Sequence, residues 1–192
     1  MSFIVTGLAW RWLLDPTLGI AMDMSIGMKV PSGAICTLSL SFNNKGPLGT
    51  FFLREDHLRP MILLASGTGF APIKAIVEHA QAKGIHRSMH LYWGGRRPQD
   101  LYQQSRCQEW AESMPHLQFI PVVSDALAED NWQGRSGFVH RAVMEDFPDL
   151  AGFEVYACGA PVMIDAARKD FVERCHLDPE LFFADAFTSA AD

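Results

Sequence analysis

The chain has 192 residues, 48% of them hydrophobic and 20% charged, which is the composition of a folded globular protein with room for one domain or slightly more. A formal net charge of −6 argues against a nucleic-acid-binding surface, because clustered Lys and Arg residues are needed to bind phosphate backbones. The four cysteines are too far apart for a CxxC motif, so no metal site is expected, and free thiols in a reducing cytoplasm are predicted.

The first 60 residues differ in pattern from the rest. Residues 1–26 are rich in apolar side chains, but charged residues and Pro16 interrupt them, so they predict neither a membrane-spanning helix nor a signal peptide. Residues 33–42 alternate like an exposed strand, and residues 44–53 predict a turn that leads into another strand. We interpret residues 1–58 as a remnant or divergent part of a β-domain, followed by a second domain over residues 59–192.

Strands and helices alternate in the second part. Five short apolar runs predict buried strands, at 61–66, 89–95, 117–124, 153–159 and 180–187. Helical spacing, or a proline in the first turn, predicts helices between them, at 71–84, 100–114, 137–147 and 161–175. This alternation predicts an α/β fold with a doubly wound, five-stranded parallel sheet. Ligands of such sheets bind beyond the carboxyl ends of the strands, so the loops after residues 66, 94, 124, 159 and 187 should line one crevice.

The segment Ser66-Gly67-Thr68-Gly69 stands between the first of these strands and the helix after it. Backbone N–H groups at a helix N-terminus bind anions, and small residues there let an anion come close. Taken alone, the segment is equally consistent with a glycine turn that binds nothing. The dinucleotide motif GxGxxG is not present, and the hydrolase motif GxSxG fails because Leu64 occupies its first glycine position.

Companion motifs strengthen the anion hypothesis. The strings "KGPLGTFFLREDHLRP", "LLASGTGFAPIKAI", "LYWGGRRPQDLY", "VYACGAPVMIDAAR" and "FFADAF" follow one another in this order. In order and spacing they resemble the ferredoxin–NADP reductase superfamily over residues 44–192. Within it the chain is most similar to the flavin reductases of the CDP-6-deoxy-delta-3,4-glucoseen reductase type, and then to the reductase components of aromatic-ring oxygenases. The resemblance implies electron transfer from NADH through FAD to an iron–sulfur protein.

The resemblance also implies a set of nucleotide-binding residues. They are Gly67, Thr68, Gly69 and Pro72 for the pyrophosphate, Gly94 and Arg96 beside the adenosine ribose, and Gly159, Pro161 and Met163 on the nicotinamide side. Pro47, in the turn Gly46-Pro47-Leu48-Gly49, matches the end of the flavin domain.

Three further residues are implied for the reaction itself. Cys158 matches the cysteine that faces the nicotinamide, and Asp185 and Phe187 match a carboxylate and an aromatic residue near the flavin. Cys158 could equally be a small core residue, and Phe187 could belong to the core face of the last strand. Asp185 shares that face by strand alternation, where a buried carboxylate needs a partner.

Charge favours NADH over NADPH as the nucleotide. The third predicted strand ends in Ser124-Asp125, where relatives that use NADPH commonly have Ser-Arg. The carboxylate of Asp125 repels a 2′-phosphate and can accept hydrogen bonds from ribose hydroxyls. Arg96 and Arg97 are the residues that argue against this preference.

The flavin part departs from the family pattern. The family's Arg-x-Tyr-Ser flavin motif is absent, only 45 residues precede Gly46, and residues 1–32 are expected to match no relative. One hypothesis is a flavin reductase with weakly held or partner-supplied flavin. An alternative is a truncated nucleotide-binding module without autonomous catalysis, and a third is a structural partner of another chain's flavin. Residues 1–43 are expected either to form a shortened β-lobe or to pair two copies into a homodimer.

Overall fold

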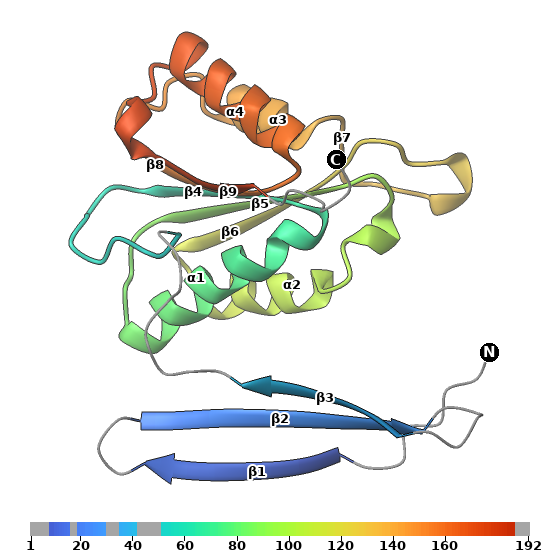
Figure 1. The fold of residues 1–192 in the computed structure, drawn as a ribbon. Coiled ribbons are helices and arrows are strands. Elements are labelled where there is room, and N and C mark those ends of the chain that lie inside the picture. Colours follow the sequence, from blue (N-terminus) through green and yellow to red (C-terminus); the bar gives the residue numbers. More distant parts are fainter. Residues whose placement is uncertain (1–7, 16–18, 30–34, 42–50, 187–192) are drawn as a thin grey trace. The chain divides into compact units, whose positions relative to one another are not determined.

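The computed structural model describes residues 8–15, 19–29, 35–41 and 51–186, with side chains from residue 51 onward. The chain divides into two compact units, Met1–Thr50 and Phe51–Asp192. Figure 1 shows the elements of each unit. The predicted boundary between the remnant of a flavin-binding β-domain, residues 1–58, and the nucleotide-binding domain, residues 59–192, stays a prediction.

The first unit contains a three-stranded antiparallel sheet. Its strands are β1 (Leu8–Asp15), β2 (Gly19–Lys29) and β3 (Ile35–Ser41), with β2 in the middle. The register pairs Trp12 with Met22 and Ser25 with Ser39. Strand β3 confirms the strand predicted from the alternation of residues 33–42, whereas β1 and β2 were not predicted.

The strand expected within residues 44–53 does not form in its described part, residues 51–53. Leu53 instead packs in the hydrophobic core of the second unit with 5% of its surface exposed. The next backbone N–H, that of Arg54, donates to the hydroxyl of Tyr156 at 3.0 Å. The Tyr156 hydroxyl therefore accepts the backbone hydrogen bond that a carbonyl oxygen of a neighbouring strand would accept in a sheet.

The second unit contains a six-stranded parallel sheet in the order β7-β6-β5-β4-β8-β9. The strands are β4 (Met61–Ser66), β5 (Met89–Gly95), β6 (Leu117–Val123), β7 (Arg135–Ser136), β8 (Glu154–Gly159) and β9 (Phe182–Ala186). All five predicted strands are confirmed. The predicted number is one too low because β7 has only two residues, which pair with Val122 and Val123 and are too few to show a pattern.

Two helices cover each face of this sheet (Figure 1). Helices α1 (Phe70–Lys83) and α2 (Gln104–Ser113) lie on one face, and α3 (Val139–Asp146) and α4 (Pro161–Arg174) lie on the other. Helix α2 begins later than predicted because residues Pro98–Asp100 form a separate 3-10 turn, in which the Asp100 carboxylate accepts from the backbone N–H groups of Arg96 and Arg97. None of the described helices is long and apolar enough to span a membrane.

Strand β4 lies at the centre of the fold. Its residues 61–65 are fully buried and point alternately into the two hydrophobic cores. This burial on both faces explains why the strand is a continuous apolar run in the sequence and does not alternate. The loop that follows β4 is thereby anchored to a strand that is buried on both faces.

Buried charges tie the segment before β4 to the amino ends of two strands. The carboxylate of Glu154, at the start of β8, is fully buried and pairs with the guanidinium of Arg87 and, at 2.6 Å, with Nδ1 of His57. Arg87 also donates to the carbonyl oxygens of Arg54 and Arg59. We call Glu154, Arg87 and His57 the Glu154 cluster.

Candidate functional site

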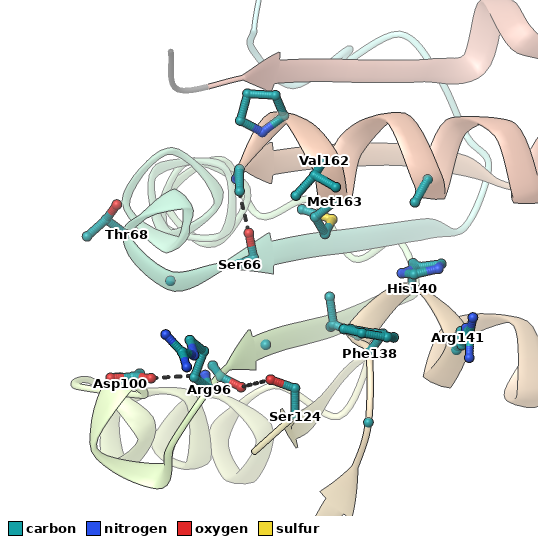
Figure 2. Close-up of a pocket in the computed structure, with 18 of the residues that line it drawn as sticks. Ser66, Thr68, Arg96, Asp100, Ser124, Phe138, His140, Arg141, Val162 and Met163 are labelled. Carbon is teal, nitrogen blue, oxygen red and sulfur yellow. Dashed lines mark hydrogen bonds between the residues drawn. The ribbon is translucent and has the colours of Figure 1, made fainter. Parts of the chain in front are cut away.

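A pocket of about 1150 Å³ lies at the carboxyl ends of the parallel strands. The loops after β4, β5, β6 and β8 line it, as Figure 2 shows for Ser66, Arg96, Ser124 and Met163. Four of the five loops expected to form one crevice therefore meet, and the fifth, after residue 187, lies outside the described residues. The pocket opens where β4 stands between β5 and β8, at the reversal of strand order where doubly wound sheets bind ligands.

The loop after β4 is the predicted anion-binding segment. Gly67–Gly69 form a 3-10 turn that runs directly into α1, and Gly67 and Thr68 line the pocket. The indole Nε1 of Trp93 donates to the carbonyl oxygen of Gly67 at 3.1 Å, and the ring of Phe70 stacks on Trp93 with centroids 3.8 Å apart. These contacts hold the backbone at the N-terminus of α1 in place beside the pocket.

Gly69 and Pro72 stand behind the pocket and do not line it. A Cβ atom at Gly69 would come within 2.2 Å of the carbonyl oxygen of Cys158. Gly69 is therefore required for close packing of the loop on β8. The anion-binding role predicted for Gly67 and Thr68, which line the pocket, stays a prediction. Pro72 is half-buried in the first turn of α1.

The start of α4 forms the wall beside this loop. The backbone N–H of Ala160 donates to Oγ of Ser66 at 3.2 Å, which joins the loops after β4 and β8. Pro161 and Met163 line the pocket, whereas Gly159 is buried against Ser66. Val162 also lines it, and with 77% of its surface exposed it adds apolar surface that was not predicted.

The loops after β5 and β6 carry some of the charged residues of the site. Gly94 and Arg96 line the pocket, and the Arg96 guanidinium lies 3.6 Å from the Asp125 carboxylate, with both side chains largely exposed. Arg97 is turned to Asp130, to which its Nε donates at 2.8 Å. This hydrogen bond raises the pKa of Arg97. Of the two arginines that argued against NADH, only Arg96 lines the pocket.

The residues predicted for the reaction do not line this pocket. Cys158 is fully buried, and burial raises the pKa of its thiol to about 12, so the thiol is protonated at neutral pH and is no nucleophile. Asp185 lies beside Cys158 in the β8–β9 register and is exposed, so water can solvate its carboxylate, and its role near the flavin stays a prediction. Phe187 and Pro47 lie outside the described residues.

Helices α3 and α4 contribute lining residues that the sequence did not indicate. Phe138, His140 and Arg141 come from the start of α3, and Asp170 comes from the third turn of α4. Phe138 is 58% exposed, and the Arg141 guanidinium carbon lies 5.4 Å from its ring centroid. Because β7 was not predicted, its carboxyl end was not counted among the loops of the crevice.

Known proteins match both parts of the chain. The family profile described as the oxidoreductase NAD-binding domain matches residues 63–169, and the profile described as bacterial oxidoreductases, C-terminal, matches residues 4–56. Protein RfbI of Salmonella typhimurium is 50% identical over 183 residues, which cover 92% of this chain and 53% of RfbI. The CDP-6-deoxy-L-threo-D-glycero-4-hexulose-3-dehydrase reductase of Yersinia pestis is 48% identical over 143 residues, 74% of this chain and 42% of that protein.

Among solved structures, the cytochrome P450 reductase GcoB of Amycolatopsis is similar with a TM-score of 0.70 and 27% identity, over 96% of this chain and 70% of that one. The chain spans about half the length of the curated relatives that it matches. The match to RfbI leaves too few residues unaligned to omit all of residues 1–32, so the expectation that this segment matches no relative is wrong.

Proposed function

The chain belongs to the oxidoreductase NAD-binding domain family, and we propose that the pocket beyond the carboxyl ends of β4, β5, β6 and β8 binds NADH. The observation that carries the proposal is the meeting of four separate strand-end loops around one pocket of about 1150 Å³, with part of the 3-10 turn that leads into α1 on its wall. Nucleotide sites are commonly concave pockets at this position of doubly wound sheets, with volumes of about 300–1,000 Å³.

Each part of the dinucleotide has a counterpart among the residues that line the pocket or stand directly beside it. Backbone N–H groups at Gly67 and Thr68, at the positive end of the α1 dipole, suit the pyrophosphate. Arg96 and the neighbouring Asp125 suit the adenosine ribose, and the exposed ring of Phe138 offers a face for the adenine. The nicotinamide then lies toward Pro161, Met163 and the strand end at Cys158 and Gly159.

The chemistry proposed for the pocket is hydride transfer, which NADH supplies when bound. The chain's own residues bind and orient the nucleotide, and the protonated thiol of Cys158 serves as packing beneath the strand end. FAD is the proposed acceptor because relatives are named flavin reductases. Asp185 and Phe187 are its proposed neighbours, and Pro47 its contact in the first part of the chain.

An iron–sulfur protein is the proposed final electron acceptor, since relatives are named as ferredoxin reductase components of dioxygenase systems. A homodimer through residues 1–43 is also part of the proposal. Within the described residues β1 and β3 pair only with β2, which leaves each with a free edge that can pair with another strand. The cytoplasm is the proposed compartment because the cysteines with described side chains are free thiols.

Titration with NADH, followed by fluorescence of the nucleotide, tests the proposal. We expect saturable binding of one NADH per chain and, after addition of FAD without oxygen, loss of the flavin absorbance as the flavin is reduced. Binding of NADH without flavin reduction would support the alternative, a nucleotide-binding module without autonomous catalysis. If NADH does not bind, the proposed function is wrong.

Replacing Asp125 should change the choice of nucleotide. In the unmodified chain the carboxylate repels a 2′-phosphate and pairs with Arg96. In Asp125→Ser the repulsion is lost and Arg96 can pair with the phosphate, so we expect the ratio of NADPH to NADH affinity to rise about tenfold, which corresponds to about 1.4 kcal/mol. Dissociation constants for both nucleotides measure this ratio.

Glu129→Ser is the matched control, because Glu129 is also an exposed carboxylate but lies 3.7 Å from Arg97, which does not line the pocket, whereas Asp125 lies 3.6 Å from the pocket residue Arg96. It should leave the ratio unchanged. Adding Arg96→Ala to Asp125→Ser should remove most of the gained NADPH affinity. An Asp125→Ser protein with an unaltered ratio would refute the role proposed for Asp125.

A further inference from the structure

A consecutive run of pocket residues comes from the start of one short helix. The run is Gly137, Phe138, Val139, His140 and Arg141, and α3 itself has only 8 residues. In Figure 2 the labelled side chains of Phe138, His140 and Arg141 lie together on one side of the pocket. The contacts that fix the position of α3 therefore also fix this part of the pocket wall.

The connection from β7 to α3 is tight. Only Gly137 and Phe138 separate the two elements. The backbone N–H of Gly137 donates to the carbonyl oxygen of Val123 on β6 at 3.0 Å, and its φ of +113° is one that residues other than glycine rarely adopt. With so short a connection, a shift of α3 against β7 displaces Phe138 as well.

The far end of α3 is tied back to the sheet by side chains. The guanidinium of Arg135, on β7, donates to Glu145 at 2.6 Å and to Oδ2 of Asp146. The same Asp146 oxygen accepts from the hydroxyl of Tyr92, on β5, at 2.6 Å. Burial, and then this hydrogen bond, raise the pKa of Tyr92, so its hydroxyl stays protonated and donates. We call Arg135, Glu145, Asp146 and Tyr92 the α3 brace.

The α3 brace is a network and not an isolated ion pair. The side chains of Arg135 and Asp146 are 32% and 37% exposed, a range in which a single pair contributes little, whereas charges that share partners contribute more. The indole Nε1 of Trp132 also donates to the carbonyl oxygen of Arg135 at 2.9 Å, which holds its backbone. None of the four brace residues lines the pocket, so any effect on a ligand must pass through the position of α3.

We propose that Arg135 is a positioning residue for nucleotide binding, which holds the last turn of α3 to β7 and so keeps Phe138 in place on the pocket wall. The inference rests on the proposed function, in which the ring of Phe138 offers a face for the adenine. Residues outside a binding site support it by fixing the residues that touch the ligand. When fewer free molecules hold the binding-competent arrangement, the affinity falls by the same fraction.

Arg135→Gln removes the charge and the two contacts to the end of α3. We expect NADH binding to weaken about tenfold, as it does when about one free molecule in ten keeps the competent arrangement. ADP-ribose, which lacks only the nicotinamide, should lose about the same factor, because Phe138 is assigned to the adenine. Fluorescence titration measures NADH, and competition against NADH measures ADP-ribose.

Arg106→Gln is the matched control. Arg106 pairs with Glu109 at 3.1 Å on α2, with its side chain 48% exposed and outside the pocket lining, so both affinities should stay unchanged. Asp146→Ala removes the carboxylate that Arg135 and Tyr92 share and should weaken binding as Arg135→Gln does. The double variant should bind about as well as either single variant, because both changes break one network. Thermal unfolding followed by circular dichroism establishes that each variant is folded.

The outcomes separate this inference from the proposed function. A folded Arg135→Gln protein that binds NADH as tightly as the unmodified chain would overturn the positioning role and leave the NADH site standing. Absence of NADH binding by the unmodified chain would overturn both. An unchanged affinity for ADP-ribose, or losses that add in the double variant, would refute the route from Arg135 through α3 to Phe138.

Discussion

Glu154→Gln is expected to lower the free energy of unfolding by about 3–5 kcal/mol, because it leaves the buried guanidinium of Arg87 without a counter-charge. The Glu154 carboxylate is fully buried and the Arg87 side chain is 6% exposed, so water cannot replace the lost partner. Glutamine has nearly the same volume, so the loss reports charge and hydrogen bonding and no cavity. Urea unfolding followed by fluorescence of the buried Trp93 and Trp110 measures the change.

Glu109→Gln is the matched control for this prediction. Glu109 pairs with Arg106 at 3.1 Å on the exposed side of α2, and exposed pairs contribute at most about 1 kcal/mol. Adding Arg87→Met to Glu154→Gln should cost less than the sum of the two single changes, since the stranded charge is removed. If Glu154→Gln is no more destabilising than Glu109→Gln, the Glu154 cluster is not the anchor that its burial indicates.

Glu154→Gln should leave the affinity for NADH nearly unchanged in the folded protein. The Glu154 cluster lies at the amino ends of β5 and β8, whereas the pocket lies at their carboxyl ends. The two ends of the parallel sheet therefore have separate tasks. One end fixes the segment that leads into β4, and the other end carries the loops that bind the ligand.

Strands β4 and β8 could be predicted because burial on both faces makes them nearly continuous apolar runs, and the other long strands of the sheet are also mostly apolar. The loops after β4, β5, β6 and β8 followed from that prediction, because parallel strands bring their carboxyl ends to one edge. The sequence could not indicate β7, whose two residues are too few for a pattern. It also could not indicate the Glu154 cluster, since Glu154 and Arg87 are far apart in the chain and meet only through the strand order.

The pocket residues Phe138, His140 and Asp170 were missed for a related reason. Asp170 lies in the third turn of a helix, where an acidic residue is typical of a solvated face, and its place on the pocket wall depends on how α4 packs beside α3. Gly69 was assigned to the anion site because glycines in a strand-to-helix turn are typical of one. Its contact with the carbonyl of Cys158 depends on the packing of β8, which no local pattern records.

Gly69→Ala is expected to weaken NADH binding by up to about 100-fold. Its Cβ atom would lie 2.2 Å from the carbonyl oxygen of Cys158 and 2.6 Å from Cα of Gly159, and both are backbone atoms that cannot rotate away. Adding a methyl group to a closely packed site costs about 1–3 kcal/mol. In the free variant the loop avoids the steric clash by moving away from β8. Binding of NADH must return the loop to its original position, so the free energy of the clash is lost from the binding free energy.

Gly152→Ala is the control, because a Cβ atom at Gly152 meets nothing within 4 Å and should leave the affinity unchanged. Dissociation constants for NADH and unfolding curves for both variants separate a displaced loop from a protein that fails to fold. A folded Gly69→Ala protein that binds NADH as tightly as the unmodified chain would show that the contact between this loop and β8 does not position the pyrophosphate site. Gly67 and Thr68 are unchanged in the variant. The weakened binding expected here would therefore show that the pyrophosphate site depends on the packing of this loop against β8.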